Sequence, residues 1–260
     1  MKMLFRYCLL SCLMCIQGCA VLGTYNPATE KTEFIAISTH QEVTMGYDVH
    51  TTIQGKFNFS DDRPLLDRLE KITSKLSIVS DRQDYEYKFY LVEDDSLNAF
   101  TTPGGSIYVH TGLLKAMPSD DQVAFVIAHE IGHCAAKHVA KKYQAALGYD
   151  LIGNILLEQI SSEGYVRTIA SLSSDVIMKL VFSAYSRADE NEADRLGVKY
   201  TYLAGYDPQG GVESFQILRQ EDKKSFMPHM LRSHTQLDQR ITNIKKEIEA
   251  IKIKYGRFRK

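Results

Sequence analysis

The chain has 260 residues, 44% of them hydrophobic, which is enough for one sizeable domain with its own core. Its 31 lysines and arginines nearly balance 32 aspartates and glutamates, so the formal net charge is -1. A chain this close to neutral has no overall field that would gather nucleic acid, and we expect no nucleic-acid partner.

The first residues have the composition of an export signal. Two of the first six residues are basic, and residues 7–16 form a mainly apolar run that is too short to span a membrane. The following Ile16-Gln17-Gly18-Cys19 resembles the lipobox at which bacterial lipoprotein signals are cut before a lipidated cysteine. The sequence therefore predicts a lipoprotein signal peptide over residues 1–18 and a lipid anchor on Cys19.

An ordinary signal peptide is the alternative, because Gly18-Cys19-Ala20 also fits a small-x-small cleavage site. Cleavage there would release a soluble periplasmic protein. Either route removes the first three of the five cysteines, so at most Cys19 and Cys134 remain. A structural disulfide is therefore not expected.

A helix and a small sheet are predicted next along the chain. Leucines and isoleucines at helical spacing predict a core-facing helix over residues 61–79. Alternation of aromatic and polar residues predicts a strand over residues 85–92, and a second strand follows the Pro103-Gly104-Gly105 turn at residues 106–110. These two strands would form the sheet.

The second half of the chain is predicted to be helical. Ser119 and Gln122 form a capping box that opens a long helix running toward Lys142. Ser186 can cap a further helix that stops at Gly205. The other apolar segments are typical of amphipathic or short helices, and they are residues 151–157, 166–182, 210–220 and 241–251, the last followed by a basic tail.

His129-Glu130-Ile131-Gly132-His133 has the HExxH spacing. Residues four apart on a helix project side by side, so the two imidazoles can share one Zn²⁺ ion that keeps a position open for water. Glu130 can take the proton of that water and deliver it to a leaving amine. A solvated polar helix face is the alternative, but the apolar neighbours predict a mainly buried helix, where polar groups need a reason.

Zinc needs a third protein ligand from elsewhere in the chain. The metzincin pattern is excluded, because Ala136 and Val139 stand where its glycine and third histidine would be. Glu190 and Asp194 have ExxxD spacing, so Glu190 can bind the metal while Asp194, one turn on, hydrogen-bonds a ligand imidazole. Glu192 is a competing ligand. The sequence thus predicts a gluzincin site with one Zn²⁺ per chain.

With these residues in place, the chain resembles the HtpX, CAAX-prenyl-protease and Oma-like metalloprotease family, in particular its periplasmic, BepA-like members. The resemblance covers roughly residues 40–245 and its combined motifs are highly specific. The segments that carry it are His129 to His133, Tyr185 to Asp194, Ala204 to Pro208, Asn98 to Tyr108, Ser233-His234 and Arg240-Ile241.

The resemblance implies roles for individual residues: His129, His133 and Glu190 as zinc ligands, Glu130 as base, and Asp194 as a supporting acid sometimes assigned proton donation. It also implies that His234 and Arg240 face the cleft as part of the catalytic machinery. Thr235 follows His234 where the family usually has proline, and an exposed loop histidine is the alternative. We expect His110 and His138 to be structural or solvated.

A substrate-binding edge strand is the second implication of the resemblance. An exposed strand offers unpaired amides and carbonyls to the main chain of an extended peptide, with little demand on side chains. The alternative is a plain hairpin turn at residues 103–105. The substrate-binding residues implied by the family are Asn98, Ala99, Phe100, Gly104 and Gly105.

We therefore expect an α+β zincin-like fold, mostly helical around a small β-sheet with an active-site edge strand. A tether and packing segment would cover residues 19–60, and the protease domain residues 61–260 with its basic C-terminal helix. The expected function is zinc-dependent cleavage of peptide bonds in unfolded or misassembled cell-envelope proteins. The alternatives are a non-enzymatic, chaperone-like lipoprotein that binds unfolded chains, and a metal-dependent hydrolase acting on another substrate.

The expected location is the periplasmic side of the outer membrane. Ala20 after Cys19 lacks the acidic signal that retains lipoproteins at the inner membrane, which favours the outer membrane by family analogy. The alternative is a soluble periplasmic protein. The expected partners are extended or unfolded polypeptides, the membrane through the lipid on Cys19, and other envelope assembly proteins.

Overall fold

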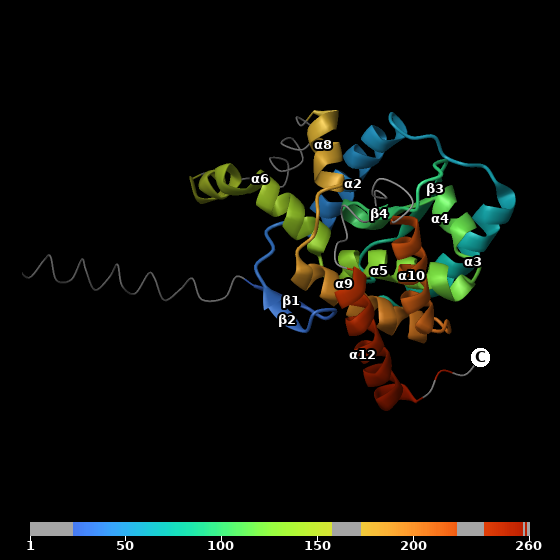
Figure 1. Ribbon diagram of the computed structural model, residues 1–260. Helices are drawn as coiled ribbons and strands as arrows, with labels where there is room; N and C mark the ends of the chain where they lie inside the picture. The colour runs from blue at the N-terminus through green and yellow to red at the C-terminus, as the bar shows by residue number, and fades with distance from the viewer. Residues whose placement is uncertain (1–22, 158–172, 223–236, 257, 259–260) are drawn as a thin grey trace, which may run out of the picture.

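The computed structural model describes residues 23–157, 173–222, 237–256 and 258 (Figure 1). The expected signal peptide, Cys19 and His234 lie outside the described residues. Helices surround a three-stranded sheet, and a separate two-stranded hairpin precedes them. The fold is therefore α+β and zincin-like, as the sequence predicted. None of the helices described has the length and apolar character needed to cross a membrane.

The N-terminal part consists of the hairpin and two helices, which are β1 (Thr24–Asn26), β2 (Lys31–Glu33), α2 (Thr39–Gln54) and α3 (Arg63–Val79). The side chains of Ser38 and Gln41 cap α2 reciprocally, and Asp62 caps α3. Met45 and Val49 of α2 are fully buried. This helix, which precedes the predicted protease domain, therefore packs into the rest of the protein.

The central sheet has the strand order β3-β5-β4, with β3 and β5 parallel and β4 and β5 antiparallel. Its strands and the connecting 3-10 turn are β3 (Lys88–Val92), β4 (Ala99–Thr101), η2 (Pro103–Gly105) and β5 (Ser106–His110). Because strand side chains alternate, Ile107 and Val109 join one apolar cluster and Tyr108 joins another. The sheet therefore separates two cores, and β4 lies at its edge.

The remaining helices are α4 (Thr111–Ala116), α5 (Asp120–Ala135), α6 (His138–Leu157), α8 (Ser174–Val181), α9 (Arg187–Leu203), α10 (Gln209–Asp222) and α12 (Leu237–Tyr255). The prediction of one continuous helix from Ser119 toward Lys142 is wrong. The chain breaks between α5 and α6, where Lys137 has a left-handed φ of 57°. The predicted stop at Gly205 is confirmed, since α9 ends just before that glycine and its φ is 81°.

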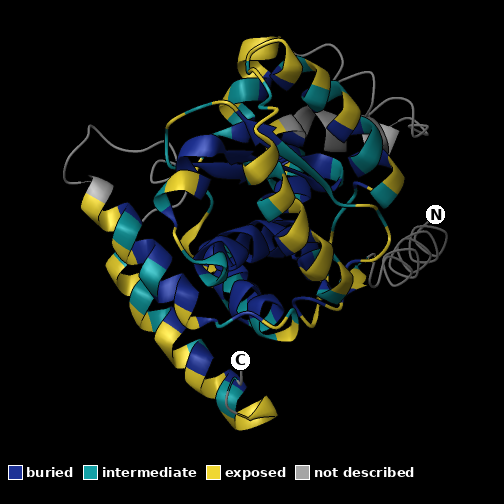
Figure 2. Cartoon of the chain, turned by 90° about the vertical axis from the view of Figure 1, so that its right-hand side faces the viewer, coloured by how far each residue is buried: buried dark blue, intermediate teal, exposed yellow. Residues whose placement is uncertain are grey.

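The two cores differ in the elements that build them. The larger cluster joins one face of the sheet to α3, α5, α9, α10 and α12, and the smaller joins the other face to α2, α6 and α8. Figure 1 shows α2 and α8 on one side of the sheet and α5, α9 and α10 on the other. Figure 2 shows the buried residues gathered in the interior, with exposed residues on the outward sides of the helices. Helix α5 thus lies inside the protein.

Candidate metal centre

Helix α5 carries the HExxH residues in a fully buried setting. The Ser119 hydroxyl accepts from the Asp121 amide, and the Gln122 side chain accepts from the Ser119 amide, which defines the start of the helix. Every residue from 122 to 135 is buried. His129 and His133, one turn apart, have their Nε2 atoms 3.1 Å from each other. The helical spacing therefore aims both imidazoles at one point.

Helix α9 crosses α5 closely because glycines lie at the contact. A Cβ atom on Gly132 would lie 3.0 Å from the carbonyl oxygen of Ala193, and one on Gly197 would lie 3.4 Å from the Cα of His129. The small side chains therefore let the two backbones approach. This approach places Glu190 and Asp194, both buried on α9, against the two imidazoles.

His129, His133 and Glu190 form the metal group, in which one ligand atom from each lies within 4.8 Å of the others. Nε2 of His133 is 3.4 Å from Oε1 of Glu190, and Nε2 of His129 is 3.7 Å from Oε2. In a tetrahedral zinc site with bonds of about 2.0–2.1 Å, neighbouring ligand atoms lie about 3.3–3.4 Å apart. Two imidazoles and a carboxylate are also ligands that zinc prefers, so the group fits the ion.

Burial keeps the two imidazoles neutral. It lowers the pKa of His129 below its ordinary value and that of His133 well below it, although nearby carboxylates oppose the change. A neutral imidazole offers a nitrogen lone pair, which a protonated one lacks. The metal group therefore presents its histidines in the form that binds a cation.

Asp194 and Arg240 surround the outer side of His129. Oδ1 of Asp194 is 3.0 Å from Nδ1 of His129, so the carboxylate can hold the ring with Nε2 toward the metal group. Arg240 bonds Asp194 through two nitrogens, at 2.8 and 2.7 Å, and contacts Oε2 of Glu190 at 2.6 Å. Burial alone would raise the pKa of Asp194, but Arg240 and His129 hold it below its usual value.

The sequence led us to expect Arg240 in the cleft, and the structure buries it, with 2% of its surface exposed. Its guanidinium contacts the buried carboxylates of Asp194 and Glu190, which need a compensating cation where water does not reach. One of its nitrogens also lies 3.4 Å from Nε2 of His129, the nitrogen that faces the metal group. Its expected part in catalysis stays a prediction.

Glu130 is fully buried on α5 between the two histidines. Tyr185 stacks on the His133 ring with 3.9 Å between centroids, and Lys142 lies 4.0 Å from the Tyr185 centroid. Lys142 donates to the backbone carbonyls of Val181 and Ser183. Burial lowers the pKa of Lys142 to about 8, although the charge of Glu130 opposes this. A layer from α6 and the segment before α9 thus covers one side of the site.

Peptidase family M48 matches residues 66–248, which is more than half of the chain. The chain belongs to peptidase family M48. M48 is a family of metallopeptidases, and this chain also has a buried group of two histidines and a glutamate. The M48 chain is therefore a metalloprotease, with a metal site of the kind that usually holds zinc.

Several curated relatives carry names that agree with this family. The beta-barrel assembly-enhancing protease of Yersinia pestis is 26% identical over 227 residues, which are 83% of this chain and 46% of that protein. The metalloprotease LoiP of Escherichia coli K12 is 34% identical over 163 residues, 62% of each chain. The mitochondrial metalloendopeptidase OMA1 of Arabidopsis thaliana is 34% identical over 149 residues, 57% of this chain and 29% of its own. The M48 chain spans about half the length of the first of these.

Of the two alternatives expected for His138, structural or solvated, the structure agrees with the structural one, since the residue is 2% exposed, but the sequence did not indicate its neighbours. Nδ1 of His138 lies 3.0 Å from Nδ1 of His133, and its Nε2 lies 3.2 Å from Oε2 of Glu192. Glu192, a competing ligand by sequence, thus points to His138 and is not part of the metal group. The signal was hidden because a continuous helix would turn His138 away from His133, and the helix break was not foreseen.

The predicted substrate strand contains β4, at the sheet edge beside α5. Asn98, Ala99 and Phe100 are at most 3% exposed, and the Thr101 hydroxyl lies 2.8 Å from the sulfur of Cys134 on α5. The strand is therefore fastened directly to the helix that carries the metal ligands. Gly104 has a φ of 76°, and a Cβ there would lie 2.8 Å from Val43, so the turn requires glycine.

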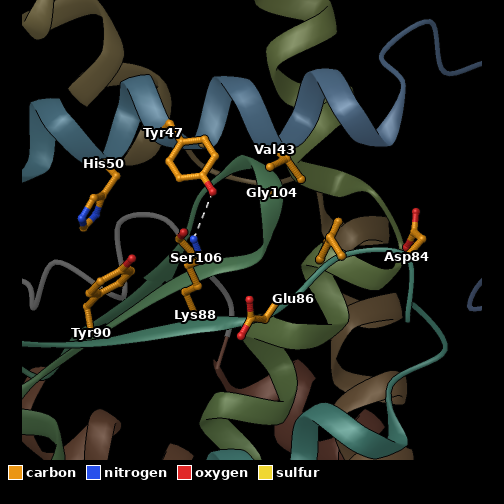
Figure 3. A pocket seen from close by; sticks show the side chains of 11 residues that line it. Val43, Tyr47, His50, Asp84, Glu86, Lys88, Tyr90, Gly104 and Ser106 are labelled. Carbon is orange, nitrogen blue, oxygen red and sulfur yellow. Dashed lines mark hydrogen bonds between the residues drawn. The ribbon is translucent and has the colours of Figure 1, made fainter.

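A pocket of the M48 chain, the α2–β3 pocket, is lined by none of the metal-group residues and has a volume of about 310 Å³. The Tyr47 hydroxyl accepts from Lys88 at 3.3 Å, and His50 stacks beside Tyr90 (Figure 3). The lining residues are Val43, Gly46, Tyr47, His50, Asp84, Tyr85, Glu86, Lys88, Tyr90, Gly104 and Ser106. Within the described ranges, the metal group is the single cluster with ligand atoms close enough for an ion. We therefore take that group, and not this pocket, as the catalytic centre.

Proposed function

We propose that the chain is a zinc-dependent endopeptidase that cleaves unfolded or misassembled proteins of the cell envelope. The observation that carries the proposal is the convergence of His129 and His133 from α5 with Glu190 from α9 in a buried site. Three protein ligands leave a fourth tetrahedral position for water or substrate, as catalytic zinc sites require.

Each side chain of the site has a distinct task in hydrolysis. Zinc, when bound, supplies Lewis-acid polarisation of the scissile carbonyl and lowers the pKa of water. Glu130, next to the first ligand, accepts the proton of the attacking water and delivers it to the leaving amine. Asp194 holds the His129 ring, and Arg240 holds Asp194 and Glu190 in place. The predicted role of His234 stays a prediction.

The substrate would bind as an extended strand along β4. Among the described strands, β4 pairs with β5 alone, so its other edge faces no strand. Backbone hydrogen bonds along that edge would hold a peptide with little regard to its side chains, which suits unfolded chains of varied sequence. Residues 98–101 are at most 3% exposed in this structure, so the edge would have to be uncovered before a peptide could pair with it. The turn at Gly104 and Gly105 would shape the end of this binding edge.

The location and partners are part of the same proposal. Two of the relatives are named beta-barrel assembly-enhancing protease and metalloprotease LoiP, and the first name is that of a protease that enhances beta-barrel assembly. The lipobox at Cys19 supports anchoring on the periplasmic side of the outer membrane, with a soluble periplasmic form as the alternative. Other envelope assembly proteins are the partners we propose.

Glu130→Gln tests the mechanism, because the amide keeps the shape of the side chain and loses its basicity. We expect wild-type protein to digest casein, a chelator to stop digestion, and zinc to restore it. In Glu130→Gln digestion should fall by about 10²- to 10⁴-fold, the usual contribution of a general base, with zinc content unchanged. Glu86→Gln, an exposed glutamate of the α2–β3 pocket, is the matched control and should cleave like wild type.

The chaperone-like alternative predicts a different result. A protein that only holds unfolded chains would suppress their aggregation equally well with Glu130→Gln and would release no peptides. If the Glu130→Gln protein cleaved casein as fast as wild type, Glu130 would not be the base. If the wild-type protein still digested casein with a chelator present, the metal-dependent mechanism as a whole would be wrong.

A further inference from the structure

The two histidine ligands have different partners behind them. His129 faces a carboxylate, since its Nδ1 lies 3.0 Å from Oδ1 of Asp194. His133 faces another imidazole, because its Nδ1 lies 3.0 Å from Nδ1 of His138. An imidazole ligand almost always donates its outer N–H to a fixed acceptor, which sets its tautomer and orientation. The position of His138 therefore calls for an explanation.

The chain conformation at the end of α5 brings the two rings together. In a continuous α-helix, residues five apart point about 140° away from each other. Here α5 ends at Ala135, Lys137 takes a φ of 57°, and α6 begins at His138. This break turns the His138 side chain back toward His133 and buries it completely. The left-handed backbone conformation of Lys137 is strained for a non-glycine residue, and it lies next to the contact between His133 and His138.

The hydrogen-bond directions follow from the metal-facing atom of His133. Its Nε2 points into the metal group, 3.4 Å from Oε1 of Glu190, so the lone pair belongs on Nε2 and the proton on Nδ1. His138 must then accept at Nδ1 and carry its own proton on Nε2. That nitrogen lies 3.2 Å from Oε2 of Glu192 and 3.4 Å from Oδ1 of Asp189, both of which can accept.

We propose that His138 and Glu192 are positioning residues that hold His133 in its metal-binding orientation, as Asp194 holds His129. Glu192 in turn bonds Lys31 of β2 at 2.9 Å, so the relay ends on the N-terminal hairpin. Lys31 is 62% exposed, and an exposed ion pair contributes little. The inference rests on the proposed zinc site and adds to it residues that touch neither metal nor substrate.

Zinc affinity, measured by competition with a chromophoric chelator, tests the relay without relying on catalysis. His138→Phe keeps an aromatic ring and removes the acceptor, and we expect zinc affinity to fall by about 10- to 100-fold, the usual effect of losing such a partner. The zinc affinity of Glu192→Met should fall less than that of His138→Phe, since Asp189 remains near Nε2 of His138. His138→Gln, which restores an acceptor oxygen, should recover part of the loss.

Two matched variants and a spectrum separate positioning from general damage. His50→Phe makes the same change in the α2–β3 pocket, and Lys31→Met removes the exposed end of the relay; both should keep wild-type affinity. The visible absorption bands of the Co²⁺-loaded protein should shift in His138→Phe and not in His50→Phe, because they report the ligand geometry. Circular dichroism with chelator present shows whether each variant folds.

The outcomes distinguish this inference from the proposed function. If wild-type protein bound no zinc, the proposed function itself would fail. Suppose that wild type bound zinc and that both variants stayed within about 2-fold of its affinity, although a 10- to 100-fold loss is expected for His138→Phe and a smaller loss for Glu192→Met. The relay alone would then be overturned. Should His138→Phe not fold, the Glu192→Met affinity and cobalt spectrum decide. Loss of the metal in Glu192→Met, together with wild-type affinity in His138→Phe, would make Glu192 a ligand and contradict the relay.

Discussion

The metal group and the α2–β3 pocket contain the same kinds of side chain and differ in how these are arranged. Each region has histidine, glutamate, lysine and tyrosine close together. In the metal group three ligand atoms converge within 4.8 Å in a buried place, whereas the pocket residues line an open volume of about 310 Å³. A hollow alone therefore does not mark an active site, but convergence of polar groups under burial does.

Lys142 beside the metal group and Lys88 in the pocket show the same contrast, because their pKa values shift in opposite directions. Burial lowers the pKa of Lys142, beside the metal group, to about 8. The hydrogen bond to the Tyr47 hydroxyl raises the pKa of Lys88, in the pocket. Burial penalises the charged form and a partner in open surroundings favours it, so residues of one type shift in opposite directions.

Arg240→Met should produce the largest change in stability. It leaves the buried carboxylates of Asp194 and Glu190 without their cation, and breaking such a buried pair costs about 3–5 kcal/mol. We expect this loss in the urea midpoint with chelator present. Bound zinc should reduce the difference in unfolding free energy between Arg240→Met and wild type, because the metal cation also compensates the charge of Glu190. Lys88→Met in the pocket should change the free energy of unfolding by less than about 0.5 kcal/mol, and equal losses in the two variants would erase the contrast.

Lys142→Met should change how stability depends on pH. The folded pKa is about 8, and an unfolded lysine has a pKa of about 10.4. Between these values the unfolded chain binds more protons, so the free energy of unfolding should rise with pH. The rise is at most roughly 3 kcal/mol, given about 1.4 kcal/mol per pKa unit. Lys142→Met should remove it, which urea midpoints across this window can show.

Lys88→Met is the control for that experiment, with the opposite sign. Because the folded pKa of Lys88 is raised, its contribution is present below the unfolded pKa and fades as pH rises through the folded value. A difference between wild type and Lys142→Met that stayed flat over the window would mean that Lys142 is solvated in the folded protein.

Tyr47→Ala should have the smallest effect. Tyr47 is 56% exposed and contacts Lys88 at the mouth of the pocket. We expect a change below about 0.5 kcal/mol in the free energy of unfolding, as for most surface substitutions. Zinc content and casein digestion should equal those of wild type. A drop in zinc affinity would instead couple the pocket to the metal group and weaken the comparison between them.

Much of the local structure could be predicted from the sequence. Capping residues at Ser119 and Ser186, and the glycine stop at Gly205, mark helix ends through bonds made within a few residues. The strand predicted over residues 85–92 begins only at Lys88, because its early residues belong to a loop beside α2. Boundaries that depend on such distant packing are the ones that periodicity misjudges.

The chain's own spacing determined that His129 and His133 lie side by side, because four residues make about one helical turn. It determined neither which acid joins them nor what lies behind them. The close crossing of α5 and α9 at glycines brings Glu190 inward and leaves Glu192 to His138. These choices belong to the tertiary structure, since they depend on how two helices far apart in sequence pack and on one left-handed residue that ends α5.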